Sequence, residues 1–146
     1  MQTDPVSADR LRLDTPALNA FLAAALPALA DTSRGRVTEA APGRVRMVMR
    51  ADGRDLRPGP VVSGAALMAL ADVAAYALVL AHIGPVEMAV TNTMTTHFLR
   101  PCPAGPVTAD AVLLRLGRRI VTTEVRLWAE SPDRLVAHAT VAYSQP

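Results

Sequence analysis

The chain has 146 residues, which is enough for one domain with its own core and too few for two ordinary domains. Apolar residues make up 51% of it and charged residues 19%, a composition that excludes an intrinsically disordered protein. All the basic residues are Arg, the net charge is only +2, and no aromatic residues are interleaved with the arginines, so no nucleic-acid partner is predicted.

The chain is expected to begin with a tail and a short helix. Residues 1–14 are predicted to form a flexible N-terminal tail, and residues 15–146 a single domain. A helix is predicted from Thr15 to Leu29, with Thr15 as its cap and Pro27 as the residue that ends or bends it. Its apolar residues recur on one side, through which it is expected to pack on the domain.

Two strands and a loop follow this helix. The strands are predicted over residues 35–40 and 44–51, because a Pro-Gly turn separates them and the second alternates apolar with polar residues. Residues 56–60 (LRPGP) show no regular pattern and are expected to form an irregular loop that leads into the next helix.

The segment from Ala65 to Ile83 is apolar except at Asp72 and is predicted to form a helix, for which Ser63 is a suitable N-cap. Its length approaches that of a membrane span. Because it carries a central carboxylate and is followed by strand-like alternation, we expect a buried helix and no association with a membrane.

The rest of the chain predicts strands, over residues 88–99, 107–116, 119–129 and 135–144. Short turns join them, which implies antiparallel pairing, since parallel neighbours need a long crossover. A helix that is apolar on nearly every side needs cover all round, and one curved sheet can provide most of it. The predicted fold class is therefore α+β, a long central helix wrapped by a five- to six-stranded antiparallel sheet.

The cysteine and histidine residues restrict the chemistry. The single cysteine, Cys102, cannot form an internal disulfide, and the polar N-terminus is unlike a signal peptide, so a cytoplasmic protein is predicted. His82, His97 and His138 have no metal-ligand spacing, and we expect neither a metal nor a redox cofactor.

Asp72 is the residue that points to a function. Burying a lone carboxylate is costly unless it is neutralised, hydrogen-bonded or used, and the helix that carries it starts with free N–H groups at Gly64. The two residues are roughly 12 Å apart along one helix, too far for one carbonyl group to touch both. Two such helices antiparallel across a two-fold axis would bring the start of one to the middle of the other.

In that dimer the N–H of Gly64 would polarise a thioester carbonyl and stabilise the developing oxyanion. Asp72 of the other subunit would act as a general base on water, or as a nucleophile through an anhydride. The alternatives are a structural carboxylate hydrogen-bonded across the interface and, for Gly64, simple close packing at a helix start.

Residues from about 57 to 146 resemble the hotdog-fold acyl-CoA thioesterases of the phenylacetate-degradation (PaaI) type. The resemblance depends on the order and spacing of five stretches, which are Val62-Ser63-Gly64, Leu70-Ala71-Asp72, Thr91 to Pro101 (TNTMTTHFLRP), Leu116-Gly117-Arg118 and Leu135 to Ala139.

The resemblance implies a hotdog fold and hydrolysis of an acyl- or aryl-thioester by a homodimer or homotetramer, with coenzyme A as part of the substrate. It implies that Gly64 is the oxyanion donor and Asp72 the catalytic carboxylate, from opposite subunits. Thr91 falls where some members carry a Ser or Thr that positions the attacking water. Arg100, Arg118 and Arg119 fall near where relatives meet the coenzyme A phosphates.

The chain departs from the family pattern around the helix start. Ser63 replaces the usual His and Ala65 the second Gly, and Arg57 stands where members often have an Asn or Gln that orients the carboxylate or the thioester. Ser63 and Arg57 are kept as candidate catalytic and substrate-binding residues at these positions. No His is placed by sequence to activate Ser63 as a nucleophile.

Tyr76 lies one turn after Asp72, where it could line the acyl pocket, hydrogen-bond the carboxylate or belong to the core. Two other functions remain open besides the thioesterase. One is a non-catalytic acyl-CoA-binding protein, suggested by the missing His and Asn or Gln. The other is a hotdog dehydratase or hydratase, which would need a His paired with the carboxylate.

Overall fold

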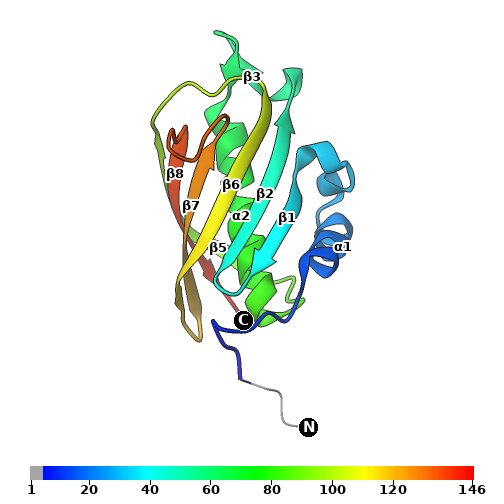
Figure 1. Cartoon of the computed structure of the whole chain (residues 1–146). Helices are drawn as coiled ribbons and strands as arrows, with labels where there is room; N and C mark the ends of the chain where they lie inside the picture. The colour runs from blue at the N-terminus through cyan, green and yellow to red at the C-terminus, as the bar shows by residue number, and fades with distance from the viewer. Residues whose placement is uncertain (1–4) are drawn as a thin grey trace.

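A long helix and a six-stranded antiparallel sheet form the body of the protein, as a computed structural model that describes residues 5–146 shows (Figure 1). The helix, α2 (Gly64–Ile83), contacts all six strands. The strand order is β1-β2-β6-β7-β8-β5. The bounds are β1 (Arg36–Ala41), β2 (Arg44–Ala51), β5 (Val90–Phe98), β6 (Gly105–Leu116), β7 (Ile120–Trp128) and β8 (Ala137–Ser144). The predicted α+β class and its central wrapped helix are confirmed.

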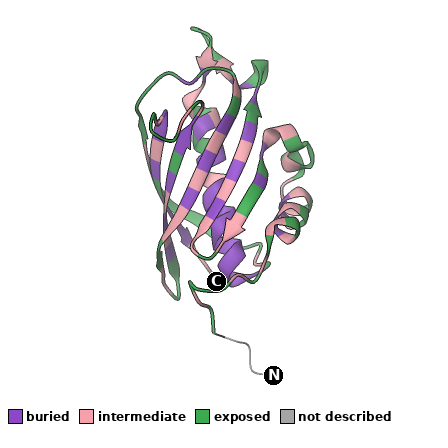
Figure 2. Cartoon of the chain, viewed as in Figure 1, coloured by how far each residue is buried: buried purple, intermediate pink, exposed green. Residues whose placement is uncertain are grey.

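Helix α2 is buried along its second half and partly open along its first. Every residue from Ala74 to Ile83 is buried, whereas Ala65, Met68 and Ala69 are exposed on one side. Figure 2 shows the lower part of the helix, behind the strands, in the purple of buried residues. Among residues 5–146, α2 is the one helix whose length and composition would allow it to cross a membrane. Its burial against the sheet is typical of a core helix instead.

Helix α1 (Thr15–Ala25) covers one edge of the sheet. Its Asn19 side chain donates to the carbonyl of Val37 and accepts from the N–H of Val37, both at 2.9 Å, and so fills hydrogen-bonding positions on edge strand β1. The predicted cap was wrong: the Asp14 carboxylate accepts the N–H of Ala17 at 3.0 Å, because an acidic side chain suits a helix N-terminus better than Thr15.

The end of the first helix was also predicted too late. Helix α1 stops at Ala25, because Pro27 cannot continue it, and two 3-10 turns follow, η1 (Pro27–Ala30) and η2 (Thr32–Arg34).

The segment before α2 is more regular than the sequence suggested. After the 3-10 turn η3 (Gly53–Asp55), β3 (Leu56–Arg57) and β4 (Val61–Val62) pair as a small hairpin instead of an irregular loop. The N–H of Val62 donates to the carbonyl of Cys102 at 2.8 Å, which ties the hairpin to the segment after β5. A two-residue ladder is too short to produce a readable alternation.

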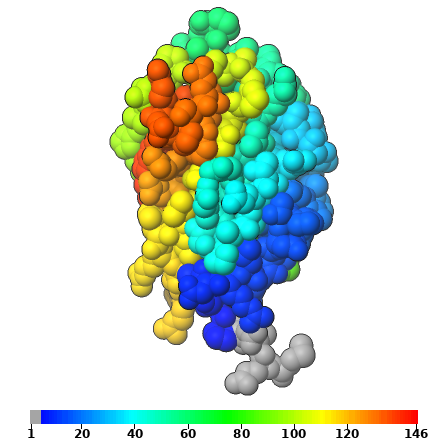
Figure 3. Space-filling model, viewed as in Figure 1, coloured from blue at the N-terminus to red at the C-terminus, as the bar shows by residue number. Residues whose placement is uncertain are grey.

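The predicted N-terminal tail is attached to the domain at its C-terminal end. The N–H groups of Arg12 and Leu13 donate to the carbonyl of Ala81, at 2.7 and 3.3 Å, and Leu11 and Leu13 pack against the core. Figure 3 shows this segment against the lower end of the body. Residues 1–4 of the tail lie outside the described residues, and its flexibility stays a prediction.

Candidate active site

Asp72 lies midway along α2 on the side that faces β5 and β8. It is half-buried, and its Oδ1 accepts two hydrogen bonds of 2.7 Å, from the hydroxyl of Thr91 and from the hydroxyl of Tyr143. The Tyr143 hydroxyl is also 3.0 Å from the backbone carbonyl of Asp72. Among residues 5–146 nothing bonds to Oδ2. One carboxylate oxygen is thus fixed by two donors, and the other is free to take part in chemistry.

The register of the sheet places both donors. Thr91 on β5 and Tyr143 on β8 are directly opposite each other, so their side chains point to the same face, toward α2. The pairing shifts by one residue between Thr91 and Thr93, which is a β-bulge, a feature that often re-aims a side chain beside an active site. The predicted site residue Thr91 therefore contacts Asp72.

Tyr76 and Tyr143 form an aromatic wall beside the carboxylate. Their rings are stacked with centroids 5.7 Å apart, and both side chains are buried. Burial raises the pKa of the Tyr143 hydroxyl far above its usual range, and the hydrogen bond to Asp72 acts in the same direction, so the phenol stays a donor at neutral pH.

Tyr76 lies at the site without touching the carboxylate. Its hydroxyl donates to the carbonyl of Glu87 at 3.1 Å, and burial, followed by the charge of Glu87, raises its pKa. Three roles were open for Tyr76. Its side chain packs in the core and lines the cavity, and its hydroxyl is bonded to Glu87 and not to the Asp72 carboxylate.

A cavity of about 680 Å³ opens in front of Asp72. Its walls come from the middle of α2, from the start of β5 and the segment before it, and from the last residues of α1, and its polar lining includes Thr91 and Tyr143. The lining near α1 is formed by Ala24, Ala25, Leu26 and Val73, which are all apolar. The site thus combines a carboxylate oxygen that has no hydrogen-bond partner among residues 5–146 with an apolar space, as a site for a small organic ligand does.

The start of α2 provides donors for an oxyanion. The hydroxyl of Ser63 accepts the N–H of Ala66 at 3.2 Å, which confirms it as the N-cap, and no described side chain is placed to activate that hydroxyl. The N–H groups of Gly64 and Ala65 have no partner among the described residues and lie at the positive end of the helix dipole. A Cβ at position 64 would be 3.2 Å from the Phe98 ring.

The structure does not bring all the predicted site residues together within one chain. Asp72, Thr91 and Tyr76 meet at the start of β5. Gly64 and Ser63 lie near its end, where Phe98 contacts Gly64.

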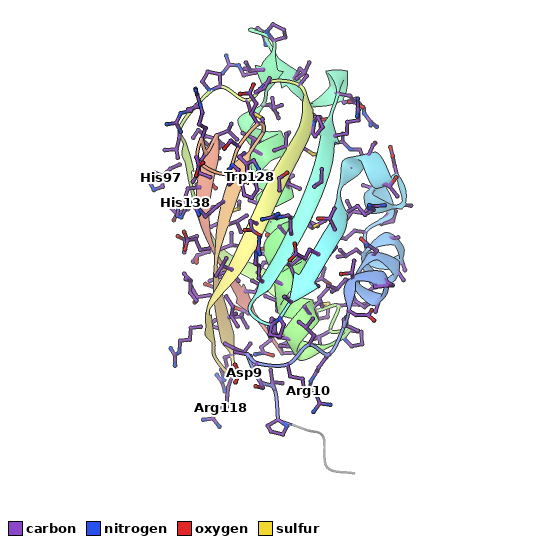
Figure 4. The ribbon with its side chains drawn as sticks, viewed as in Figure 1. Asp9, Arg10, His97, Arg118, Trp128 and His138 are labelled. Atoms are coloured by element: carbon purple, nitrogen blue, oxygen red, sulfur yellow. The ribbon has the colours of Figure 1, made fainter. Side chains whose placement is uncertain are left out.

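The four arginines predicted to bind the substrate also lie at two opposite ends of the sheet. Arg57, in the exposed hairpin before α2, and Arg100, whose guanidinium donates to the carbonyl of Leu135 at 2.8 Å, lie at the end of the sheet where α2 begins. Arg118 and Arg119 lie in the β6–β7 turn at the opposite end of the sheet. The two ends are separated by the length of β8, whose eight residues span roughly 26 Å. Figure 4 shows Arg118 pointing away from the body. One phosphate group could not contact both pairs in a single chain.

Histidine and cysteine side chains stay away from the cavity. His82 is fully buried between the carbonyl of Leu78 and the N–H of Gly43. His97 on β5 and His138 on β8 pair with each other, and their side chains lie on the outer face of the sheet, away from α2 (Figure 4). Burial raises the pKa of the Cys102 thiol, which makes it a poor nucleophile. Among residues 5–146 no cluster of His, Cys, Asp or Glu could hold a metal ion.

Sequence reasoning missed Tyr143 and the part of the cavity wall that comes from the end of α1. The sequence indicates Tyr143 only weakly. The chain has two tyrosines, and the spacing of Tyr76 from Asp72 predicts a position at the site for Tyr76 alone. The pairing of β8 with β5, which joins segments about 50 residues apart, was needed to find it.

Comparison with known proteins agrees with this geometry. A model of the thioesterase superfamily matches residues 59–137, more than half of the chain. A protein of Silicibacter sp. TM1040, provisionally named a thioesterase, has a crystal structure that is 36% identical, with 96% of each chain covered and a TM-score of 0.86. A mutant of the phenylacetic acid degradation protein PaaI from Thermus thermophilus is 27% identical, over 82% of this chain and 99% of that one, with a TM-score of 0.72.

A protein of Thermoplasma acidophilum that is provisionally named an esterase is 33% identical over 70 residues, which span 48% of this chain and 52% of that protein. The chain belongs to the thioesterase superfamily. The hotdog fold and the PaaI-type resemblance are confirmed, and the predicted enzyme class, a thioester hydrolase, is confirmed at the level of the family.

Proposed function

We propose that the protein is an acyl-CoA hydrolase in which Asp72 of one subunit and the N-terminus of α2 of the other act on the same thioester. The observation that carries the proposal is the carboxylate itself, with Oδ1 held by Thr91 and Tyr143 and Oδ2 free in front of a cavity. Such a group is positioned to take a proton from water.

The reaction then needs few groups. Oδ2 of Asp72 accepts a proton from water, whose oxygen attacks the thioester carbonyl carbon. The N–H of Gly64 from the partner donates to the oxygen that becomes negative. Collapse of this intermediate breaks the carbon–sulfur bond and releases the acid and the thiol, which takes the proton. Direct attack by the carboxylate through an anhydride is the variant in which Oδ2 is the nucleophile.

The two edges of the sheet support a dimer formed through β5. Edge strand β1 is covered by Asn19 of α1. Edge strand β5 pairs only with β8, contains no Pro or Lys that would discourage pairing, and is exposed along most of its length. Beside it lies the exposed apolar stripe of α2, formed by Ala65, Met68 and Ala69. A second copy would cover both features.

An antiparallel pairing of β5 with the β5 of a second copy would also bring Asp72 of one subunit close to Gly64 of the other. The end of β5 that carries Phe98, next to which Gly64 of α2 lies, would be placed beside the start of the partner's β5, where Asp72 and Thr91 meet. Arg57 and Arg100 of one subunit would then approach Arg118 and Arg119 of the other. Arginines from both chains could in this way serve the phosphates of one coenzyme A.

Replacement of Asp72 by Asn tests the proposal. Asn keeps the size of the side chain and can still accept from Thr91 and Tyr143, but it cannot take a proton from water. We expect hydrolysis of the best substrate in a panel of acyl- and aryl-CoA esters, followed with a thiol-detecting dye, to fall at least hundredfold.

Asp133→Asn makes the same change on an exposed loop residue and should leave the rate unaltered. Equal rates for Asp72→Asn and wild type would reject Asp72 as the base. Tight binding of an ester without thiol release by the wild type would favour the non-catalytic alternative. The dehydratase alternative loses support because no His lines the cavity among its described walls.

A further inference from the structure

A second cavity lies beside the candidate active site, behind two apolar side chains. It has a volume of about 240 Å³ and lies between the 3-10 segment after α1, strand β2 and the first half of α2. Leu26 and Val73 line this cavity and also the cavity in front of Asp72. These two side chains therefore form the wall that separates the two spaces.

The lining of the second cavity suits a hydrocarbon. Met47 and Met49 from β2 and Leu70 from α2 face it. Its single charged lining residue is Arg34, and that guanidinium is already bound to both carboxylate oxygens of Asp55, at 2.8 Å each. A pocket lined almost wholly by apolar side chains suits an apolar ligand.

The wall stands next to the reacting group. Val73 directly follows Asp72 on α2. Leu26 ends α1, with its N–H donating to the carbonyl of Leu22 and its own carbonyl accepting from Leu29, both at 2.8 Å. An acyl group whose carbonyl carbon lies at Asp72 and whose chain extends along the apolar side of the first cavity meets this wall.

We infer that the second cavity is an acyl-chain subsite closed off by Leu26, which makes Leu26 the residue that limits the length of the acyl group. The inference rests on the proposed function, because it takes Asp72 as the position of the thioester carbonyl. The substrates of the unaltered protein are then thioesters whose acyl groups end at Leu26. Removing the Leu26 side chain connects the two cavities.

The test measures binding apart from turnover. Straight-chain acyl-CoA esters of four to sixteen carbons are titrated calorimetrically into Asp72→Asn and into the double variant Asp72→Asn/Leu26→Ala. Each buried methylene group should tighten binding about fourfold until the chain reaches the wall.

An apolar cavity of about 150 Å³ holds the six carbons of benzene, so the second cavity, at about 240 Å³, should have room for at least four further carbons of a chain. We expect the length at which affinity stops rising to increase by at least four carbons in the double variant. The longest esters should bind at least tenfold more tightly than they do to Asp72→Asn.

Two further variants control for indirect effects. Leu113→Ala removes the same side chain from a half-buried position outside both cavities and should not alter the length profile. Ala28→Leu, added to the Leu26→Ala variant, places a larger side chain in the second cavity and should cancel the gain for long chains.

The outcomes separate this inference from the proposed function. An unchanged length profile in the Leu26→Ala variant overturns the subsite. The same ester series is then given to proteins with Asp72 intact. Hydrolysis with the same chain-length preference in both proteins leaves the hydrolase and rejects the subsite. A shifted binding profile without any hydrolysis keeps the subsite and rejects the hydrolase.

Discussion

At the Asp72 carboxylate, the two donors are neutral hydroxyl groups, and no arginine lines the cavity around them. Thr91 and Tyr143 fix the orientation of the carboxylate without forming an ion pair. In the proposed mechanism this arrangement would orient Oδ2 toward the space where water and thioester meet. Both residues would then be positioning residues that act through Asp72 by fixing its geometry.

Tyr143→Phe tests this role at the residue scale. The substitution keeps the ring stack with Tyr76 and removes one of the two donors to Oδ1. We expect kcat to fall about tenfold with little change in KM, because a misplaced carboxylate affects the reaction more than the binding of the ester. Steady-state kinetics with the best ester of the panel supply both constants.

Thr91 and Tyr76 supply the controls for that measurement. Thr91→Val should lower kcat in the same way, and Thr91→Ser, which retains the hydroxyl, should restore it. Tyr76→Phe removes a hydroxyl that is bonded to the carbonyl of Glu87, and it should leave kcat nearly unchanged. A rise in KM with kcat preserved in Tyr143→Phe would show that this phenol serves binding and not positioning.

At this scale the sequence predicted the half-buried carboxylate of Asp72 and part of its surroundings, while its catalytic role stays a prediction. Asp72 could be identified because it is the one charge in an apolar helix, and Ser63 because a capping residue precedes that helix. Tyr143 could not be identified, because its role follows from the register of β8 against β5 and not from any local pattern.

At the scale of elements, the start of α2 is held by the segment before it. Asp55 is buried and receives two 2.8 Å hydrogen bonds from Arg34, together with the N–H of Asp52 at 2.9 Å. Its backbone carbonyl accepts the N–H of Ser63 at 2.7 Å. Asp55 thus links η2 and η3 through its carboxylate, and through its backbone carbonyl it holds the N-cap of the helix whose first N–H groups are proposed to bind the oxyanion.

The pairing of Asp55 with Arg34 predicts how stability depends on pH. The hydrogen bonds from Arg34 hold the pKa of the Asp55 carboxyl below its usual range in the folded protein. The ionised carboxylate therefore stabilises the folded protein fully above the pKa that it has in the unfolded chain, about 3.9. This stabilisation is lost as the pH falls through the lower pKa that it has in the folded protein.

Arg34→Gln should consequently lower the free energy of unfolding by about 1–3 kcal/mol at pH 7, and the difference from wild type should shrink below about pH 4. Urea unfolding of both proteins across this pH range measures it. Arg36→Gln, at an exposed position of β1, is the matched control and should have little effect at any pH. A difference that persists undiminished at acid pH would rule out the ion pair as its origin.

The elements could be predicted to the extent that their patterns were regular. The long helix and the later strands followed from apolar runs and turn residues, with ends shifted by one or two positions. Helix α1 was predicted too long, because the apolar residues continue past Pro27, and the β3–β4 hairpin was missed, because two-residue strands leave no period to detect.

At the scale of the whole molecule, the wrapping of α2 by one sheet followed from a helix that is apolar on nearly all sides. The order of strands did not, since it depends on pairings between distant segments. That order decides which edge is open. Because β1 is covered by α1 and β5 is not, the exposed edge lies beside Asp72, and the exposed stripe of α2 lies next to it.

The order of strands also explains why one chain would carry only half of the proposed site. The group that would act on water lies at the start of β5, and the N–H groups that would bind the oxyanion lie near its end. A two-fold partner would join them, and the central claim of the proposal is therefore that each active site uses two chains.

Mixing two defective variants measures this claim directly. Asp72→Asn removes the base, and Gly64→Pro removes the N–H at the first position of α2, where proline fits a helix and Ser63 already has the extended backbone that precedes proline. Gly64→Ala is the matched control that keeps the N–H. Asp72→Asn and Gly64→Pro should each lose most of the activity as homodimers.

In the purified heterodimer of Asp72→Asn and Gly64→Pro, one of the two sites should combine an intact Asp72 with an intact Gly64. The account predicts that its rate of ester hydrolysis recovers to about half that of the wild type, since one site in each dimer is complete. A heterodimer that remains as inactive as its parents would contradict the shared site.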